Sequence, residues 1–307
     1  MAPKIIVTAV DGWTGYEIVK HITTPDLVNK FGEIYATSEG PETIADVAEL
    51  KQKKEVTFLE IDSSKNLSKM EEVFKKAEIA VLIPPAKTDK LQRSKNLIEA
   101  CKTAGLKKVV LISMAAADVA DKQKQPHIAE FQQIEHEAKQ AGFDHLTIIR
   151  VNFYTENLLL YKEQMHKGKL PLPIHDGKFA PVAIKDVAEG VGALLSDCEK
   201  FHKSNEECCI TLTGDKALGG SEIASCISKC TGCKLEFDNI SNEEAQKILA
   251  NVKGLDESEQ HVLVEFYDLV KANNAAFVTD SFKNLVSHDP TSLEEFCKLH
   301  ESELKSK

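Results

Sequence analysis

The stretch that most constrains this chain lies at its start, in KIIVTAVDGWTGYEIVKHI, residues 4 to 22. The run from 4 to 10 is apolar and rich in β-branched residues, which predicts a buried strand. After a glycine-containing turn, apolar side chains recur at Ile18, Val19 and Ile22, the spacing of one helix face. A strand, a tight turn and a helix form half of a dinucleotide-binding βαβ unit. The helix N-terminus offers N–H groups and a positive dipole end to a pyrophosphate.

The small residues of this turn are spaced as A-x-x-G-x-x-G, with Ala9, Gly12 and Gly15 at the small positions. The usual dinucleotide fingerprint is G-x-G-x-x-G, and an alanine disfavours the positive φ that a glycine accepts. Asp11 adds an anion beside the expected phosphate site, where it repels the ligand unless its side chain points away. Two interpretations stay open: a dinucleotide-binding turn, or a tight strand–helix turn that holds no cofactor.

The composition is that of a globular chain: 307 residues, 42% hydrophobic and 28% charged, enough for one large domain or two modest ones. The net charge of −10 argues against a nucleic-acid surface, because phosphate contacts need a basic footprint. No apolar run approaches the roughly 20 residues of a bilayer-spanning helix. The N-terminus enters a strand at once, without a signal peptide. We therefore expect a cytoplasmic protein, with the nucleus as a second location, that binds neither nucleic acid nor membrane directly.

Eight cysteines raise the question of a metal site. Three of them form C-x3-C-x2-C, a spacing that holds an iron–sulfur cluster in radical enzymes: Cys226, Cys230 and Cys233. The surrounding residues instead predict an amphipathic helix that ends at Gly232, where free cysteines act as small hydrophobes. Cys208 and Cys209 lie in a strand-like run, where packing is commoner than a redox pair. A cytosolic chain keeps its thiols reduced. We expect no metal.

Beyond the first helix, apolar strands alternate with helices. The predicted strands are 33–37, 56–63, 79–83 and 108–113, and the predicted helices are 43–53, 67–76 and 91–104. This alternation indicates a parallel sheet with right-handed crossovers. A ligand of such a sheet lies at the carboxyl ends of the strands, at the switch point of their order. Pro84, Pro85 and Ser113 fall at that edge.

The end of the second strand normally selects the cofactor. An acid there accepts the ribose 2′-OH of NAD, and an Arg accommodates the 2′-phosphate of NADP. This chain has Ser38, Glu39 and Gly40 at that point, with no Arg nearby in the sequence. Glu39 would serve NAD and repel NADP. We therefore expect that NAD is not disfavoured relative to NADP.

The chain resembles the NmrA-like family of atypical short-chain dehydrogenases over nearly its whole length. The resemblance is carried by AVDGWTG, LEIDS, IPPA, VVLISMAAAD, AGFDHLTIIRVNFYTENLL, LPLPIHDGKFAPVAIKDVAEGV, ITLTGDKALGGSEIASCIS and DPTSLEEF. Each stretch is short, and their order and spacing together make the assignment. It implies an α/β fold: a Rossmann-type doubly wound parallel sheet with a smaller C-terminal α/β domain. The NAD(P)-binding Rossmann domain would span 1–157, rejoined by about 178–200, and the smaller substrate or partner domain 158–307.

The resemblance also implies site residues. Those implied to bind the cofactor are Ala9, Gly12, Trp13, Thr14, Gly15, Ser38, Glu39, Asp62, Ile83, Pro84, Pro85, Ser113, Asn152 and Phe153. Those implied to line a substrate cleft between the domains are Met114, Phe131, Tyr154, Asn157 and Phe179. Asp62 would lie near the adenine. We expect weak binding of NAD or NADP.

Catalysis is where the chain departs from the family. A short-chain dehydrogenase uses a Tyr and a Lys four residues later. The two matching strings, 16–20 and 267–271, fall outside the expected segment. In the family, the helix before AGFDHL carries a single Lys, 11 residues before the glycine. Counting back from Gly142 reaches Phe131, which binds no ribose hydroxyl. His127 is the best remaining proton donor, because His titrates near neutral pH. The alternative for His127 is an exposed loop residue after Pro126.

Two residues near this segment have lesser expectations. Ser113 and Met114 occupy the place of the usual Ser pair, and Glu135 is expected to cap or pair locally. Two functions remain. The first is a non-catalytic sensor or regulator that binds a dinucleotide weakly and a regulatory protein partner by its surface. The second is an NAD(P)H-dependent reductase of quinone-like or other small substrates, in which water supplies the proton. Loss of acid–base residues costs about 10²–10⁴-fold in rate and leaves some activity.

Overall fold

The computed structural model describes residues 2–40, 47–65, 67–197, 200 and 209–305. The chain divides into two compact units, and each is assembled from separate stretches of the sequence. Unit 1 comprises Met1–Met114, Glu130–Arg150 and Val187–Ile210, and unit 2 comprises Ala115–Ala129, Val151–Asp186 and Thr211–Lys307. Among the described residues, no helix has the length and apolar character needed to cross a bilayer.

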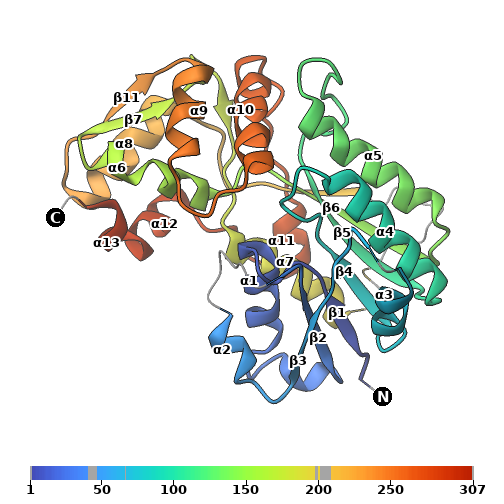
Figure 1. Cartoon of the computed structure of the whole chain (residues 1–307). Coiled ribbons are helices and arrows are strands. Elements are labelled where there is room, and N and C mark those ends of the chain that lie inside the picture. Colours follow the sequence, from blue (N-terminus) through green and yellow to red (C-terminus); the bar gives the residue numbers. More distant parts are fainter. Residues whose placement is uncertain (1, 41–46, 66, 198–199, 201–208, 306–307) are drawn as a thin grey trace. The chain divides into compact units, whose positions relative to one another are not determined.

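A seven-stranded sheet organises unit 1, with the order β3-β2-β1-β4-β5-β6-β9 (Figure 1). Its strands are β1 (Ile5–Val7), β2 (Ile34–Ser38), β3 (Val56–Glu60), β4 (Ile79–Leu82), β5 (Lys108–Met114), β6 (His145–Val151) and β9 (Cys209–Leu212). β1 pairs in parallel with both β2 and β4, and β2–β3 and β4–β5 are also parallel. The order runs outward in opposite directions from β1, so the switch point lies between β1 and β4. The predicted doubly wound α/β sheet is confirmed.

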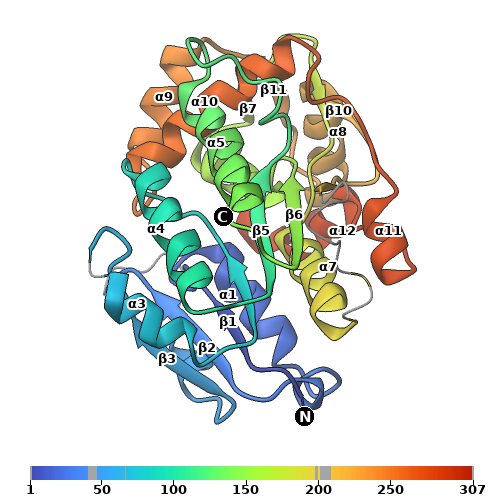
Figure 2. The same ribbon diagram turned by 90° about the vertical axis from the view of Figure 1, so that its right-hand side faces the viewer.

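Helices cover both faces of this sheet. On one face lie α3 (Leu67–Phe74), α4 (Lys90–Thr103) and α5 (Pro126–Gln140), and on the other lie α1 (Trp13–Ile22) and α7 (Ile184–Ser196) (Figure 2). The first group packs its apolar stripes on the strands, as Phe74, Cys101 and Ile134 do in the buried core. Burial of a side chain as large as Phe74 or Ile134 contributes roughly 1.5–3 kcal/mol. Of the predicted helix 43–53, the structure contains α2 (Ala48–Lys51), and residues 43–46 lie outside the described part.

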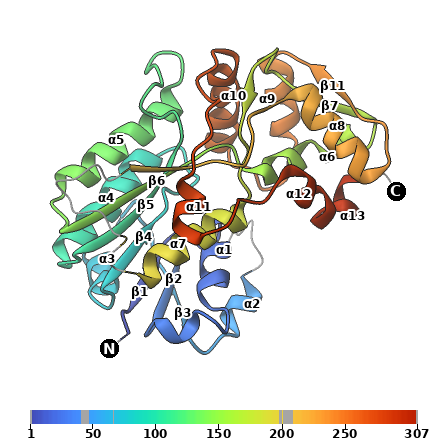
Figure 3. The same cartoon turned by 180° about the vertical axis from the view of Figure 1, so that it is seen from behind.

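Unit 2 holds two small sheets and several helices (Figure 3). β7 (Lys169–Leu172) pairs in parallel with β11 (Glu236–Asn239), and β8 (Lys178–Phe179) pairs antiparallel with β10 (Leu218–Gly219). Its later helices are α8 (Gly220–Thr231), α9 (Asn242–Ala250), α10 (Glu257–Lys271), α11 (Ser281–Val286), α12 (Leu293–Leu299) and α13 (Glu301–Leu304). As predicted, α8 ends at Gly232, whose φ of 72° is in the left-handed region that favours glycine.

For this part the sequence pattern predicts an apolar helical stretch over 153–165 and a strand over 179–183, and the structure differs from both. The apolar stretch 153–165 is not one α-helix, because it forms the 3₁₀ helix η2 (Thr155–Tyr161) and a single turn, α6 (Lys162–Met165). The strand predicted at 179–183 is only the two-residue β8, followed by an isolated bridge at Val182. Pro181 explains the interruption, since proline has no N–H to give to a strand partner.

Candidate functional site

The turn between β1 and α1 has two glycines, Gly12 and Gly15, with different structural roles. A β-carbon on Gly15 would lie 2.4 Å from the carbonyl oxygen of Ala9, so only glycine lets α1 approach β1 this closely. A β-carbon on Gly12 would meet that same oxygen at 3.5 Å, an ordinary contact. Gly12 caps α1 in extended geometry and donates its N–H to Ala9 at 3.1 Å. The fold therefore requires Gly15, whereas Gly12 keeps the approach to the helix N-terminus clear.

Ala9 carries the strain of this turn. Its φ is +50°, a conformation that costs an L-residue roughly 1–2 kcal/mol and that a glycine adopts freely. Ala9 therefore has the backbone conformation that a glycine would adopt at this position. The turn keeps the conformation that the fingerprint specifies, and the side chain of Ala9 bears the cost.

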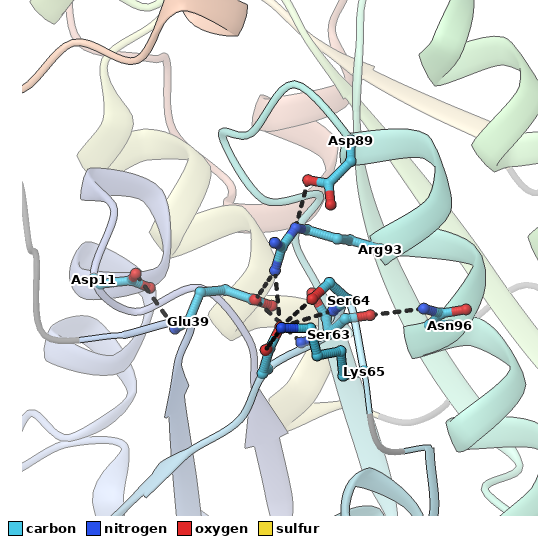
Figure 4. Close-up of polar contacts among 9 residues, drawn as sticks. Asp11, Glu39, Ser63, Ser64, Lys65, Asp89, Arg93 and Asn96 are labelled. Atoms are coloured by element: carbon cyan, nitrogen blue, oxygen red, sulfur yellow. Dashed lines mark hydrogen bonds and ion pairs between the residues drawn. The ribbon is translucent and has the colours of Figure 1, made fainter.

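The side chain of Asp11 is directed toward the end of β2 (Figure 4). Its Oδ2 accepts a hydrogen bond from the backbone N–H of Glu39 at 3.4 Å. Its Oδ1 is buried and has no hydrogen-bond partner among the described residues. Burial raises the pKa of Asp11 above the usual value for a carboxyl group. The carboxyl group of Asp11 thus points along the edge of the sheet, away from the expected phosphate site. One of its two oxygens has no hydrogen bond to a described residue.

An arginine from α4 dominates the ends of β2 and β3 (Figure 4). The Nη1 atom of Arg93 lies 2.8 Å from Glu39 Oε2 and 3.3 Å from Asp62 Oδ1, and its Nε lies 2.5 Å from Asp89 Oδ1. Glu39 Oε2 also accepts the N–H of Ser63 at 3.2 Å. Burial raises the pKa of Glu39, against the opposing effect of Arg93. The sequence has no arginine close to Glu39, but the fold brings Arg93 next to it. The expectation that no arginine lies at this position is therefore wrong.

A second polar network lies at the carboxyl end of β5. Ser113 donates its hydroxyl hydrogen bond to Glu135 Oε1 at 2.7 Å. Arg150 grips the same carboxylate with two bonds, Nε to Oε1 at 2.8 Å and Nη2 to Oε2 at 2.7 Å. The sequence predicted that Glu135 would cap or pair locally. This prediction is wrong, because the partners of Glu135 come from β5 and β6. The Ser113 hydroxyl is engaged by this buried network.

Phe131 lies on α5 and is partly exposed, and a lysine lies against its ring. The Nζ atom of Lys90, the first residue of α4, is 4.3 Å from the centroid of that ring. Lys90 is 1% exposed, and its Nζ makes no hydrogen bond within the described part of the chain. Glu130 Oε2 is 4.0 Å away. At the α5 position where the sequence count expects the family's lysine, this chain thus has an aromatic ring with an ammonium group from α4 beside it.

His127 is not an exposed loop residue, since it lies in the first turn of α5. Its Nδ1 lies 2.6 Å from Glu265 Oε1, and its ring stacks on His261 with centroids 4.7 Å apart. Glu265 also accepts the backbone N–H groups of His127 and Ile128. A carboxylate at a helix N-terminus is stabilised by the helix dipole. Glu265 therefore both caps α5 and orients the His127 ring, leaving Nε2 as the ring atom that could exchange a proton.

The other predicted residues divide between the two units. In unit 1, the predicted residues lie at or just past the carboxyl ends of β1 to β5, so they share one edge of the sheet: the turn, Ser38, Glu39, Asp62, Ile83–Pro85 and Ser113. In unit 2, Phe153 and Phe179 are buried and pack edge to face, 4.8 Å between centroids, and Phe266 joins them. Asn152 is also buried there. Contact of these residues with a cofactor or substrate stays a prediction, as does that of Tyr154, Asn157 and Met114. Cys208 lies outside the described residues, and Cys209 begins β9.

Sequence reasoning missed four residues of these networks: Lys90, Arg93, Arg150 and Glu265. One signal for two of them was available. The chain has 38 Lys and Arg residues in total, and only two are arginines. Arginine suits buried, multi-point pairing with carboxylates better than lysine does. In so lysine-rich a chain, each arginine marks a specific ion pair.

Comparisons with known proteins agree with this architecture. The model of the NmrA-like family matches residues 4–307. The chain is 28% identical to an NAD(P)H azoreductase of Xenophilus azovorans over 222 residues, 71% of this chain and 74% of that protein.

Two solved structures share the fold. An NADPH-dependent quinone oxidoreductase from Escherichia coli, solved with NADPH, has a TM-score of 0.80 at 21% identity, covering 96% of this chain and 99% of that one. NmrA, a negative transcriptional regulator solved with NAD, has a TM-score of 0.74 at 16% identity, covering 96% and 94%. Another structure of NmrA contains NADP.

Proposed function

Because the chain belongs to the NmrA-like family, we propose that it is an NAD(P)-binding sensor or regulator without ordinary reductase turnover. One observation carries the proposal: the Ser113 hydroxyl is bound to the buried Glu135–Arg150 pair. Phe131, one turn before Glu135 on α5, stands where the sequence count expects the family's lysine. A hydroxyl that donates to a buried, paired carboxylate is a poor proton donor to a substrate. NmrA, a regulator that has been solved with NAD and with NADP, gives the precedent. A regulatory role requires a protein partner, in the cytoplasm or the nucleus.

In this proposal the pyrophosphate lies against Gly12 and the N-terminus of α1, where the N–H groups and the helix dipole favour an anion. The adenosine lies over the ends of β2 and β3, beside Glu39 and Asp62. Glu39 accepts the ribose 2′-OH of NAD, and Arg93 offers a cation to the 2′-phosphate of NADP. The site would then accept both cofactors, without strong preference. Although its side chain points along the sheet edge, Asp11 keeps a carboxyl group near the turn, which keeps the affinity for an anion modest.

The two glycines of the turn give the test, because the fold needs one and the ligand needs the other. In Gly12→Ala the new methyl group meets no described atom closer than 3.5 Å, so the variant should fold like the wild type. Its methyl group fills the space that the pyrophosphate approaches, so affinity for both dinucleotides should fall at least about tenfold. Calorimetric titration with NAD and NADP measures this, with thermal melts as the folding control. Unchanged affinity in a folded Gly12→Ala protein would refute binding at this turn.

Turnover is measured separately, by following NADPH and NADH oxidation with a quinone and with an azo dye. We expect binding without oxidation above the rate of a protein-free control. Binding together with sustained oxidation would replace the sensor with the reductase. An absence of binding to either dinucleotide would reject both.

The reductase is the second candidate, and Lys90 is the observation that favours it. Its ammonium is buried without a hydrogen bond to any residue that the structure describes, and it lies beside the ring that replaces the family lysine. A buried ammonium group that lacks a hydrogen bond is costly, and a ligand hydroxyl or carbonyl would satisfy it. The azoreductase relative adds a precedent for reduction of small molecules.

A swap of two residues separates the candidates. In the reductase, Lys90→Met should remove turnover, and Lys90→Met combined with Phe131→Lys should restore part of it, because the ammonium returns on α5. The single change Phe131→Lys places two ammonium groups together and should lower the thermal midpoint, by like-charge repulsion. In the sensor, none of the three proteins oxidises NADPH. Turnover that survives Lys90→Met at the wild-type rate would exclude Lys90 from the chemistry.

A further inference from the structure

Three thiols of unit 2 meet between two helices that are far apart in the sequence. Cys226 and Cys230 lie one turn apart on α8, and Cys297 comes from α12, which lies beside α8 (Figures 1 and 3). The three sulfur atoms all lie within 4.8 Å of one another. All three cysteines are free thiols. The sequence motif C-x3-C-x2-C suggested a different trio, since Cys233 is not part of this group and Cys297 lies far beyond the motif.

The spacing of the sulfur atoms suits a metal ion. A metal–thiolate bond is about 2.3 Å long, so three sulfurs around one ion are about 4 Å apart. Each sulfur would need to move by less than about 1 Å, which a small side-chain rotation provides. Residues i and i+4 of a helix project from the same face, so Cys226 and Cys230 are held as a pair. The third donor then fixes the position of the ion.

From this geometry we propose that Cys226, Cys230 and Cys297 bind a thiophilic d¹⁰ metal ion, Cu(I) or Zn(II). Thiolates are soft ligands that select these ions. Cu(I) accepts three thiolates, whereas Zn(II) takes a fourth ligand, for which water is the source at a three-residue site. The carbonyl of Glu294 lies 3.9 Å from the Cys230 sulfur, at the edge of the group. The site is independent of the dinucleotide turn.

Exposure supports a binding site over simple packing. Cys297 is fully buried, but Cys226 and Cys230 are partly exposed, so an ion can enter from the solvent side. The apolar stripe of α8 is already provided by Ile223 and Ile227, which are buried. The core of α8 therefore does not need the two cysteines as hydrophobes. Their thiols instead border the stripe at the contact with α12.

Binding would be linked to pH and to the anchoring of α12. Cysteine binds a metal ion as the thiolate, so each thiol of the trio must release its proton on binding. An ion must displace these protons, and its apparent affinity should fall as the pH falls. The bound ion would cross-link α8 to α12, which begins at its Ser292 cap. Unit 2 should therefore melt at a higher temperature with metal than without.

The test uses the reduced full-length protein, stripped with a chelator and kept free of oxygen. Cu(I) is titrated in competition with a colorimetric Cu(I) chelator, and Zn(II) with a chromophoric Zn(II) chelator. We expect one ion per chain. Cys226→Ser and Cys297→Ser should each weaken binding at least about tenfold, since even outer-shell changes cost 10–100-fold. Cys233→Ser is the matched control, because it removes a thiol just past the same helix without touching the trio.

The two metal arms are compared by the dissociation constant that each gives, after correction for the affinity of its own chelator. Should Cys297→Ser fail to fold, the partly exposed Cys226→Ser still decides the matter. The proposal is overturned if neither ion binds with one-to-one stoichiometry. It is also overturned if Cys233→Ser loses as much affinity as Cys226→Ser. A trio that oxidises to a disulfide in air and shows no metal affinity after reduction equally rules out a metal site.

Discussion

The two arginines of the chain make ion pairs of similar burial and opposite character. Arg150 and Glu135 have 15% and 3% of their side chains exposed, and Arg93 and Glu39 have 16% and 5%. Arg150 holds its carboxylate with two parallel bonds. Arg93 is instead divided among Glu39, Asp62 and Asp89, the last two about half exposed. The first pair is balanced in charge, whereas the second has more carboxylates than cations.

This difference separates a structural pair from an exchangeable one. A bidentate pair that is neutral overall offers nothing to a ligand, and opening it leaves two buried charges uncompensated. An arginine shared by three carboxylates loses little when one of them is released, because the others remain. The excess negative charge also leaves room for a ligand hydrogen-bond donor such as a ribose hydroxyl. Two arginines at the same edge of a sheet can therefore have unequal tolerance to change.

The largest expected effect comes from changing each arginine to lysine in turn. Arg150→Lys loses one of two charge-assisted bonds, which should lower the free energy of unfolding by about 1.5–3 kcal/mol. Arg93→Lys keeps one cation among three acids and should cost less than about 1 kcal/mol. Urea unfolding of both proteins measures the contrast. Equal losses of unfolding free energy in the two variants would show that both ion pairs stabilise the fold to the same degree, and would contradict the distinction drawn between them.

A smaller effect, on cofactor affinity, is expected from Glu39→Gln. This variant tests whether Arg93 can exchange a carboxylate partner for a ligand. Removing the carboxylate ends its repulsion of the 2′-phosphate and releases Arg93 toward it. NADP should bind about tenfold more tightly. This gain is well below the roughly 4 kcal/mol that a like-charge contact at about 4 Å costs at an effective dielectric constant of about 20. NAD should gain nothing, because its 2′-OH loses an ionised acceptor. Calorimetry with both cofactors gives the ratio. Wild-type NADP binding already about 100-fold tighter than NAD would contradict the argument from Glu39.

The smallest effect is expected at Asp11, and it depends on pH. Burial raises the pKa of Asp11 in the folded state, so its protonated form is favoured on folding. The associated stability is present below the unfolded pKa, near about 3.9, and is lost as the pH rises through the folded value. Asp11→Asn should therefore stabilise the protein at neutral pH by less than about 1 kcal/mol. Thermal melts from about pH 3.5 to about pH 7.5 should show this gain vanish at the acid end. A gain that grows toward low pH would reverse the assigned sign.

Much of the fold was predictable because its signals are local. The strand–turn–helix at residues 4–22, the alternation that follows and the Gly232 end of α8 each depend on residues close in sequence. The positions of Gly12, Gly15, Glu39 and Asp62 at one sheet edge follow from the parallel order alone. Strand ends were less certain, as the interruption at Pro181 shows.

The chemistry of the site was less predictable, because its partners are distant in sequence. Arg93 meets Glu39 across 54 residues, and Glu265 meets His127 across 138. Contacts between residues so far apart in the sequence produce no periodic pattern. The pattern of hydrophobic residues also does not show which way a polar side chain points. The same reason hid Cys297 from the C-x3-C-x2-C motif and Lys90 from the family count that reached Phe131. Spacing rules find ligands on one helix and miss those supplied by its neighbour.

The left-handed backbone of Ala9 has a kinetic consequence. Strain stored in a folded turn lowers the free energy needed to open it locally, so the amide protons it holds should exchange with solvent sooner than those of neighbouring strands. The N–H of Gly12, bonded to the Ala9 carbonyl, reports on that opening. Relief of the strain in an Ala9→Gly protein should slow its deuterium uptake. A ligand at the helix N-terminus should slow it further, so this single amide would register both the conformation of the turn and its occupancy.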